Sequence, residues 1–288
     1  DCLLSRGLGD VYKRQIIEDG ITNVSDLLLN GYGYKSSIKE ISLGQSIKRI
    51  GKRAFYDCDN VKSIVLPTGL EEIEVGAFKK CGIEAIKIPD SVKQIRDDCF
   101  FHCTELQSVT LPSELQEIGS RAFAGCHSLT SILLPVSLIS MNDNAFNECK
   151  SLSEITLPAS LKSVGIYSFA NCSNLTTVNF EEGFSCNISG YMFGNCTGLT
   201  EITIPKGVLN IDYNAFDSCS RLTIVTVMGS TTQTNRNAFA NCPNLRTIKG
   251  YDCSYVKKYY DSLTDNQKKS IKFESLGKGC LLYTSPSP

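Results

Sequence analysis

The chain has 288 residues, of which 42% are hydrophobic and 20% are charged, a composition typical of a folded globular protein and not of a disordered one. Its formal net charge of -1 provides no overall positive field, so we expect no nucleic-acid partner. The apolar runs are far too short to cross a bilayer, so no transmembrane segment is predicted in this fragment. The chain has no Trp, so an aromatic ligand platform must use Tyr or Phe.

The two ends of the chain differ in character from the rest. A DNA segment that encodes Asp10 to Gln15 has a complementary strand that encodes Cys280 to Ser285 in another frame. We therefore expect residues 1–15 and 280–288 to be translated sequencing adapter and leave them out of the fold argument. On this interpretation the natural protein is longer than this fragment. Residues 16–37 contain no complete copy of the repeat that follows, and we expect them to be an N-terminal cap or the remnant of a truncated region.

A repeat of about 23 residues fills residues 38–249. Nine Cys residues, which we call the ladder cysteines, recur at steps of 22 to 24 residues, and a Phe stands three residues before each of them. An Ala usually precedes this Phe, and the nine Phe residues form what we call the Phe column. The pairs are Phe55/Cys58, Phe78/Cys81, Phe100/Cys103, Phe123/Cys126, Phe146/Cys149, Phe169/Cys172, Phe193/Cys196, Phe216/Cys219 and Phe239/Cys242.

An aliphatic pattern follows each ladder cysteine, as in Val61, Ile64, Leu66 and Pro67. Apolar residues two positions apart point to one face of an extended segment, so we expect a short strand that ends at the Pro. A second apolar pair comes next, and Ala, Phe and Cys then have the spacing of one face of a single helical turn. One such repeat, or rung, buries its apolar face only against neighbouring rungs, so we expect the rungs to stack.

Two rungs depart from this pattern, and we expect bulges or looser packing in them. Residues 175–198 contain one extra residue, with Glu181 at the Pro site and Met192 at the Ala site. Residues 222–244 have Met228 at the Pro site, and the polar run 230–234 replaces the second apolar pair.

The motif L-x-x-I-x-L-P…A-F-x-x-C, repeated over residues 38–248, resembles the BspA-like leucine-rich repeat family. The resemblance implies an α/β repeat solenoid: a right-handed stack of about nine rungs of about 23 residues, with a parallel inner sheet. Residues 250–279 leave the repeat and are expected to form a C-terminal cap. Tyr255, Tyr259 and Leu263 have helical spacing there, and residues 271–276 have the pattern of a closing strand.

The cysteines and histidines are the first candidates for chemistry. The ladder cysteines form no C-x-x-C pair and have no His at ligand spacing, so we expect a column of buried thiols packed with the Phe column, and no metal or cofactor. Cys99, Cys186 and Cys253 lie off the ladder; Cys99 is expected in the core, whereas an exposed position is open to Cys186 and Cys253. His102 and His127 each flank a ladder cysteine, but adjacent residues on a helical turn do not face each other, so we expect no Cys-His dyad and no catalytic residues.

The predicted inner sheet is the candidate binding face, because residues between its buried aliphatic positions point outward. This face is small, hydroxylic and nearly uncharged, so its residues are either a binding surface or simply good strand formers. Its expected members fall in two columns, Lys87, Thr110, Leu133, Thr156, Asn179 and Thr203 in one and Ser108, Ser131, Glu154, Thr177 and Glu201 in the other.

Three functions remain open. The resemblance implies a non-catalytic adhesion module that is secreted or on a cell surface and binds a protein or glycoprotein, because family members are often associated with bacterial or protist surfaces. The many unpaired thiols favour instead a cytoplasmic interaction scaffold. The third alternative is an accessory domain of an enzyme whose catalytic part lies outside this fragment.

Overall fold

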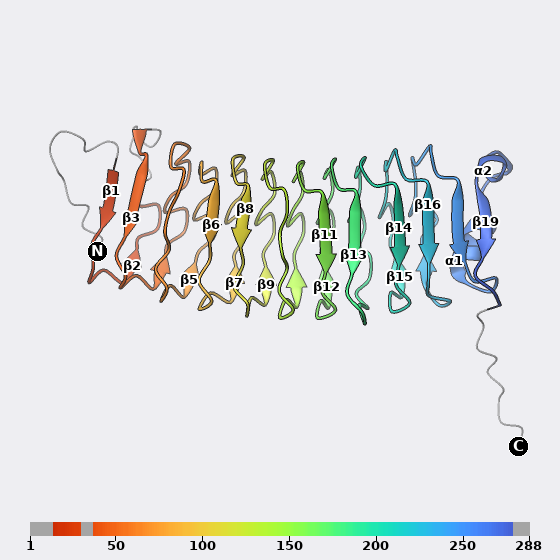
Figure 1. Cartoon of the computed structure of the whole chain (residues 1–288), viewed down its shortest axis with the longest axis horizontal. Coiled ribbons are helices and arrows are strands. Elements are labelled where there is room, and N and C mark those ends of the chain that lie inside the picture. Colours follow the sequence, from red (N-terminus) through yellow and green to blue (C-terminus); the bar gives the residue numbers. More distant parts are fainter. Residues whose placement is uncertain (1–13, 30–36, 279–288) are drawn as a thin grey trace, which may run out of the picture.

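The computed structural model describes residues 14–29 and 37–278 of the chain. They form a parallel β-solenoid of about 11 turns that stack along one axis (Figure 1). In this part of the chain the α-helices are confined to the C-terminal end (Figure 1). Of the residues that we expected to be adapter, 1–13 and 280–288 lie outside the described residues.

The first segment of each rung is the strand that follows the ladder cysteine. Its register brings equivalent residues of successive rungs side by side, for example Lys87 beside Thr110 and Thr156 beside Asn179. We call the surface formed by these segments the long-strand face. Its strands are β1 (Arg14–Ile17), β3 (Glu40–Leu43), β6 (Ala85–Lys87), β8 (Ser108–Thr110), β11 (Glu154–Leu157), β13 (Thr177–Phe180), β14 (Glu201–Ile204), β16 (Ile224–Val227), β18 (Thr247–Gly250) and β19 (Lys272–Ser275).

The long-strand face is parallel, as expected, but it is not one unbroken sheet. Within the described residues its strands pair in separate groups, β1–β3, β6–β8, β11–β13 and β14–β16–β18–β19. The rungs of Ile64 and Ile132 have no named strand here, although Ser63 makes one bridge to Ala85. Ile64 and Ile132 are still only 6% and 8% exposed, so side-chain packing keeps these rungs in place where backbone pairing is interrupted.

The second apolar pair of each rung lies at a second row of short strands that runs along the solenoid. After the Pro, a tight turn reverses the chain, as where the Leu70 amide donates to the Pro67 carbonyl over 3.0 Å. In most rungs, the second residue of this apolar pair (Ile73 in the rung of Leu70) and the residue before it then form a short parallel strand. These strands are β2 (Asn23–Val24), β4 (Arg49–Ile50), β5 (Glu72–Ile73), β7 (Gln94–Ile95), β9 (Glu117–Ile118), β10 (Ser140–Met141), β12 (Ser163–Val164), β15 (Asn210–Ile211) and β17 (Gln233–Thr234).

The segment with Ala, Phe and Cys is not the helical turn that we expected. Around Phe146, the residues two before and two after it have positive φ, 59° at Asn144 and 61° at Glu148, and this left-handed geometry interrupts an α-helix. The segment forms tight turns instead, with the Cys149 amide donating to the Phe146 carbonyl over 3.2 Å. Hydrogen bonds to the next rung hold it, such as the one from the Phe146 amide to the Ser168 carbonyl at 2.8 Å.

The Phe column is a continuous stack of rings inside the solenoid. From Phe55 to Phe239, neighbouring ring centroids are 5.2 to 5.8 Å apart, and the ring planes are within 28° of parallel. The stack ends against Tyr259, whose ring meets Phe239 edge-on at 5.6 Å. Burying an aromatic side chain contributes roughly 1.5–3 kcal/mol, so this column is a main source of stability.

The ladder cysteines lie beside this stack as buried thiols, and those from Cys81 to Cys219 are at most 2% exposed. Each thiol from Cys103 to Cys242 donates to the Phe carbonyl of the preceding rung, at sulfur–oxygen distances of 3.0 to 3.3 Å. The column therefore adds a weak hydrogen bond between rungs where an aliphatic residue would only pack.

The two irregular rungs keep a closed core by local substitutions. In the first, Phe184 and Cys186 are 1% and 6% exposed, so Cys186 does not take the exposed position that was open to it, whereas Cys253 is exposed and Cys99 is buried. In the second, Thr232 is completely buried and its hydroxyl donates to the Val208 carbonyl over 2.7 Å. That hydrogen bond offsets the cost of burying a hydroxyl at an aliphatic site.

Both ends of the described stack are covered by additional segments. At the N-terminal end, β1 pairs with β3 and β2 with β4, so the residues before 38 already contribute a strand to each ladder. Backbone groups make such a ladder, so the pairing of Arg14 and Gln15 does not depend on the origin of their side chains. At the C-terminal end, α1 (Tyr255–Asp261) and α2 (Asp265–Ser270) lead into β19, which pairs with β18.

Candidate binding face

All eleven residues that the sequence assigned to the candidate face are exposed to solvent on the long-strand face. The strands determine this, because their alternation buries Ile155 and Leu157 while Glu154 and Thr156 point outward. The face is sparsely charged, with Lys87, Glu154 and Glu201 as the charged members of the predicted set. The structure brings these residues into aligned columns, and it gathers three of them around a pocket.

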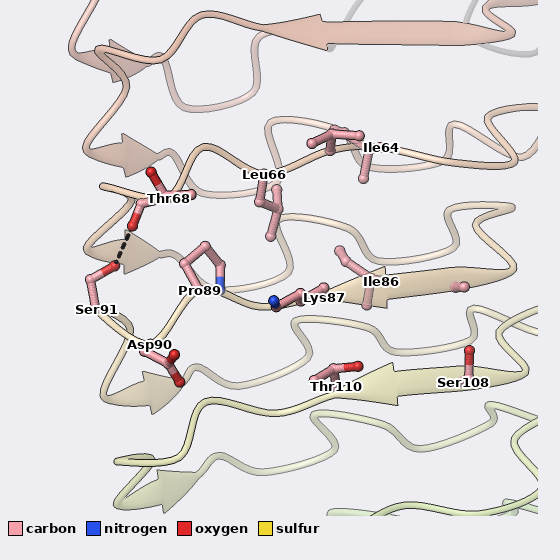
Figure 2. Close-up of a pocket in the computed structure, with 12 residues that line it drawn as sticks. Ile64, Leu66, Thr68, Ile86, Lys87, Pro89, Asp90, Ser91, Ser108 and Thr110 are labelled. Carbon is pink, nitrogen blue, oxygen red and sulfur yellow. Dashed lines mark hydrogen bonds between the residues drawn. The ribbon is translucent and has the colours of Figure 1, made fainter.

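The pocket has a volume of 590 Å³ and is lined by Lys87, Ser108 and Thr110 together with residues of the two preceding rungs. It opens beside the rung where the strand pairing is interrupted, between Ile64 and Ile86 (Figure 2). The pocket coincides with residues 64–66, where no named strand forms. The pocket therefore lies at an interruption of the strand pairing and does not recur at every rung.

The pocket is apolar along one part and polar at one end. Leu66 and Ile86 lie along it, and Thr68, Asp90 and Ser91 lie at the polar end (Figure 2). The Ser91 hydroxyl donates to the Thr68 carbonyl over 3.3 Å. Hydrophobic walls with a few fixed polar groups are typical of sites that bind a side chain or a small molecule.

Asp90 is held as a carboxylate at the end of the pocket. Its Oδ1 accepts hydrogen bonds from the Ser113 amide at 2.9 Å and the Ser113 hydroxyl at 3.2 Å. These bonds, with a smaller effect of Lys87 and Lys93, lower the pKa of Asp90 below its ordinary value. The polar end thus carries a fixed negative charge beside the Lys87 cation, which suits a ligand with both charge signs.

A second feature of the same face is an exposed aliphatic patch one rung beyond the pocket. Leu133 is 82% exposed and Val136 is 73% exposed, on either side of Pro135. Ile132 and Leu134 on the same rung are buried, so the rung presents two large aliphatic side chains to water while its core contacts are intact. Val65, at the other side of the pocket, is 79% exposed. Large exposed aliphatic groups that cluster on one face mark contact surfaces.

The sequence predicted Leu133 but not Val136, Asp90 or Ser91 as parts of this face. Asp90 and Ser91 come after β6 and line the pocket, and Val136 directly follows Pro135 on its own rung. An aliphatic residue directly after the Pro, where other rungs have Thr68, Asp90 and Ser113, was a signal available in the sequence. The pocket itself had no such signal, because it depends on pairing between rungs.

The ladder thiols from Cys81 to Cys219 are buried, and the two imidazoles lie on adjacent rungs. Burial raises the pKa of the Cys172 thiol to about 12 and raises that of Cys126 further, so these thiols stay protonated and unreactive. The rings of His102 and His127 lie 6.1 Å apart on adjacent rungs, and burial together with His127 lowers the pKa of His102. Over residues 14–29 and 37–278, no three His, Cys, Asp or Glu side chains form a group able to hold a metal ion.

The described residues also include no helix that is long and apolar enough to cross a membrane. The pocket, the aliphatic patch and the columns of hydroxyl side chains all lie on the long-strand face.

The fold is similar to solved bacterial leucine-rich repeat structures. A leucine-rich repeat protein from Bacteroides ovatus is 23% identical, with 92% of this chain and 84% of that chain covered and a TM-score of 0.51. A leucine rich cell surface protein from Faecalibacterium prausnitzii is 21% identical, with 88% and 86% covered and a TM-score of 0.42. The pneumococcal vaccine antigen PcpA is 15% identical, with 88% and 84% covered and a TM-score of 0.38.

A comparison with curated protein sequences gives no match. The family model for the BspA type leucine rich repeat region matches residues 30–153 and 139–262, with 6 copies of the repeat. These matches cover most of the chain and coincide with the stacked rungs of the solenoid. The chain belongs to the BspA-type leucine-rich repeat family.

Proposed function

We propose that this chain is a non-catalytic adhesion module, secreted or on a cell surface, that binds a protein or glycoprotein through its long-strand face. The observation that carries the proposal is the aliphatic patch, with Leu133 82% and Val136 73% exposed on a rung whose other apolar residues are buried. A partner that covers this patch gains the free energy of removing aliphatic surface from water, roughly 25 cal/mol per Å².

The patch and the pocket are close enough for one ligand to contact both. Val65 and Leu133 occupy the same column three rungs apart, about 14 Å at the usual strand spacing. Lys87 and Thr110 stand between them on the intervening rungs. A partner can therefore place an apolar group on Leu133 and a side chain in the pocket beside Asp90.

The rest of the face favours modest affinity. Its columns are rich in Thr and Ser and poor in the Tyr, Trp and Arg residues that dominate tight interfaces. Many copies of a modest site on one cell bind through avidity, because each bound copy raises the effective concentration of the next. This property fits adhesion better than tight capture of a soluble ligand.

The thiols are compatible with a location outside the cytoplasm. An intracellular scaffold was the alternative that the many thiols favoured, but the ladder thiols from Cys81 to Cys219 are buried. Buried thiols with raised pKa values react slowly with oxidants and with disulfides. Sequencing the locus beyond both ends of this chain tests the alternatives: a secretion signal or wall anchor supports adhesion, a cytoplasmic reading frame without either supports the scaffold, and a catalytic domain supports the enzyme accessory.

A cell-binding assay tests the binding face itself. Fluorescently labelled chain is added to cultured epithelial cells, and bound fluorescence is measured by flow cytometry before and after the cells are treated with protease. We expect saturable binding that protease removes, and Leu133→Ser should weaken it about ten-fold, because a buried aliphatic anchor contributes more than 1 kcal/mol.

The matched control is Leu209→Ser, which removes a leucine that is 59% exposed but lies outside the long-strand face. This variant should bind like the wild type. Equal binding by Leu133→Ser and the wild type would show that the patch is not the contact surface.

A further inference from the structure

Three tyrosines from successive rungs gather on the other side of the solenoid. In each of these rungs the tyrosine lies between the second row of short strands and the Phe of the Phe column. We call Tyr167, Tyr191 and Tyr213 the tyrosine ledge. Tyr213 follows Thr203 of the long-strand face by 10 residues, nearly half of one rung. The ledge is therefore a surface distinct from the proposed protein-binding face.

The rings of the ledge are held in a fixed arrangement. Tyr167 and Tyr191 stack with centroids 4.7 Å apart and planes 11° from parallel, and Tyr213 meets Tyr191 at 5.6 Å and 82°. A Cβ on Gly190 would lie 2.8 Å from Cζ and 2.9 Å from Cε1 of Tyr213, so the glycine packs against the face of this ring. The rings are positioned before any ligand arrives, which lowers the entropy cost of binding.

The Tyr213 side chain is partly exposed to solvent. Gly190 covers one face, and Tyr213 as a whole is 42% exposed. Within the described residues no Lys or Arg cation lies over this ring, whereas Lys258 lies over the exposed Tyr255 of the cap at 4.6 Å. Tyr213 therefore offers a flat aromatic surface to a ligand.

A carboxylate belongs to the same rung as Tyr213, because Asp217 follows that tyrosine by four residues. Burial raises the pKa of Tyr167, and the charges of Tyr191, Tyr213 and Asp217 raise it further. Asp217 is fixed by hydrogen bonds from the Asn241 amide at 2.8 Å and from the Ser218 hydroxyl at 2.9 Å. Among residues 14–29 and 37–278, no side chain or backbone group makes a hydrogen bond with the hydroxyls of the three tyrosines.

We propose that the tyrosine ledge binds the pyranose ring of a saccharide. A pyranose has one face of C–H groups, which the negative face of an aromatic ring attracts, and a rim of hydroxyls. The phenol groups and the Asp217 carboxylate provide donors and acceptors for that rim. Gly190 lies against the Tyr213 ring and Gly194 against the Tyr191 ring, and neither contributes an aliphatic side chain for a peptide to pack on.

The charge of the ledge also favours a sugar over nucleic acid. Asp217 places a carboxylate beside the rings, so a polyanion stacked there meets a like charge. Arg236 occupies the position of Tyr213 on the next rung, so a sugar that carries one carboxylate could reach a cation there. Neutral and sialylated sugars are therefore both included as probes.

The test is titration of the full chain with neutral oligosaccharides of glucose, galactose, mannose and N-acetylglucosamine, and with sialyllactose. Binding is measured by calorimetry and by saturation-transfer NMR. We expect at least one of these sugars to bind, and Tyr213→Ala should weaken it about ten-fold. The matched control is Tyr255→Ala, which removes another tyrosine of nearly equal exposure, 43%, and should leave sugar binding unchanged.

A second variant protects the test against a folding defect. Asp217→Asn keeps the shape of the side chain and one acceptor oxygen for the Asn241 amide, and it should weaken sugar binding several-fold in a chain that still unfolds cooperatively. The proposal is overturned if none of the sugars binds at millimolar concentration, or if both Tyr213→Ala and Asp217→Asn bind like the wild type. Because the ledge and the long-strand face are separate, Leu133→Ser should retain sugar binding, and failure of one proposal does not decide the other.

Discussion

At the scale of single residues, side chains on successive rungs provide one another with hydrogen-bond partners and opposite charges. Asp98 is a clear case, because it is only 8% exposed and accepts hydrogen bonds from residues on both neighbouring rungs. Arg121 Nε donates to Asp98 Oδ1 over 2.7 Å, and Lys79 Nζ donates to Oδ2 over 3.3 Å while lying 4.5 Å from the Phe101 ring centroid. A buried charge is tolerated here because two cations and an aromatic ring surround it.

The pH dependence of Asp98 follows from this geometry. Burial alone would raise the pKa of Asp98, but the hydrogen bond from Arg121 and the charge of Lys79 outweigh it and lower the pKa. A lowered folded-state pKa means that the stabilisation is present above the unfolded pKa near 3.8 and is lost as the pH falls through the folded pKa.

Asp98→Asn tests this at constant shape, since Asn also tolerates the positive φ of 55° at this position. At pH 7 the variant should unfold about 1.5–3 kcal/mol more easily, because it loses a charge-assisted hydrogen bond. The measurement is urea denaturation at pH 7, 5 and 3. The difference from the wild type should shrink toward pH 3, and a constant difference would contradict the assignment. Titration of His102 acts on both proteins and cancels in the comparison.

At the scale of elements, the Ala-Phe-x-x-Cys segment shows how a correct spacing can be assigned to the wrong structure. The Ala, the Phe one residue later and the Cys four residues after the Ala fit one face of a helical turn, but they also fit two consecutive tight turns. The residues with positive φ decide between them, and several are of the types that adopt it most easily, such as Gly76, Asn171 and Asn195. The recurrence of Asn, Asp and Gly at these positions was the signal in the sequence.

Lys80→Gly distinguishes tight turns from a helical turn by the sign of the change in the free energy of unfolding. Lys80 is exposed and has φ of 58°, two residues after Phe78, so glycine should relieve strain and stabilise the fold by roughly 0.5–1 kcal/mol. In a helical turn the same change would destabilise by about 1 kcal/mol. The measurement is the free energy of unfolding from denaturant titration.

Lys62→Gly is the control, because Lys62 is also exposed but does not have positive φ. It should be neutral or slightly destabilising. A loss of stability in Lys80→Gly as large as in a helix would contradict the turn geometry.

At the scale of the whole molecule, stability is a sum over neighbouring rungs. The Phe column and the backbone bonds on three sides join each rung to the rungs directly before and after it, so damage should remain local. Such a stack tolerates a rung whose strand pairing is interrupted, and two such rungs carry the distinctive features of the long-strand face. The pocket lies at the interrupted rung of Ile64, and the aliphatic patch lies on the interrupted rung of Ile132.

Phe146→Ala tests this local character. It should cost about 3–5 kcal/mol, since it removes a buried ring from the middle of the column and leaves a cavity. Hydrogen exchange measured by mass spectrometry should accelerate most in the rungs of Phe123 and Phe169, whose rings contact Phe146.

Thr156→Ala changes an exposed residue of β11 near the same rung and should alter stability by less than about 0.5 kcal/mol. An unchanged melting curve for Phe146→Ala, or uniform acceleration of exchange along the whole chain, would contradict this picture of the core.

The sequence by itself determined the repeat, its stacking and the inward or outward direction of most side chains in the aliphatic segments and the Phe column. A rung is short, and its apolar pattern recurs with nearly constant spacing, so local alternation and the Phe-Cys spacing are enough to predict the stack. Side chains such as Phe146 and Thr156 were assigned by this pattern alone.

Only the tertiary structure decided how each rung meets its neighbours. The tight turns around the Phe column, the interruption at Ile64 and the tyrosine ledge depend on contacts between residues about 23 positions apart. Neither periodicity nor composition contains the geometry of those contacts, because backbone pairing and ring orientation are set by the rung on either side. The repeat made the fold predictable, whereas the pocket and the aliphatic patch lie at rungs where the strand pairing is interrupted.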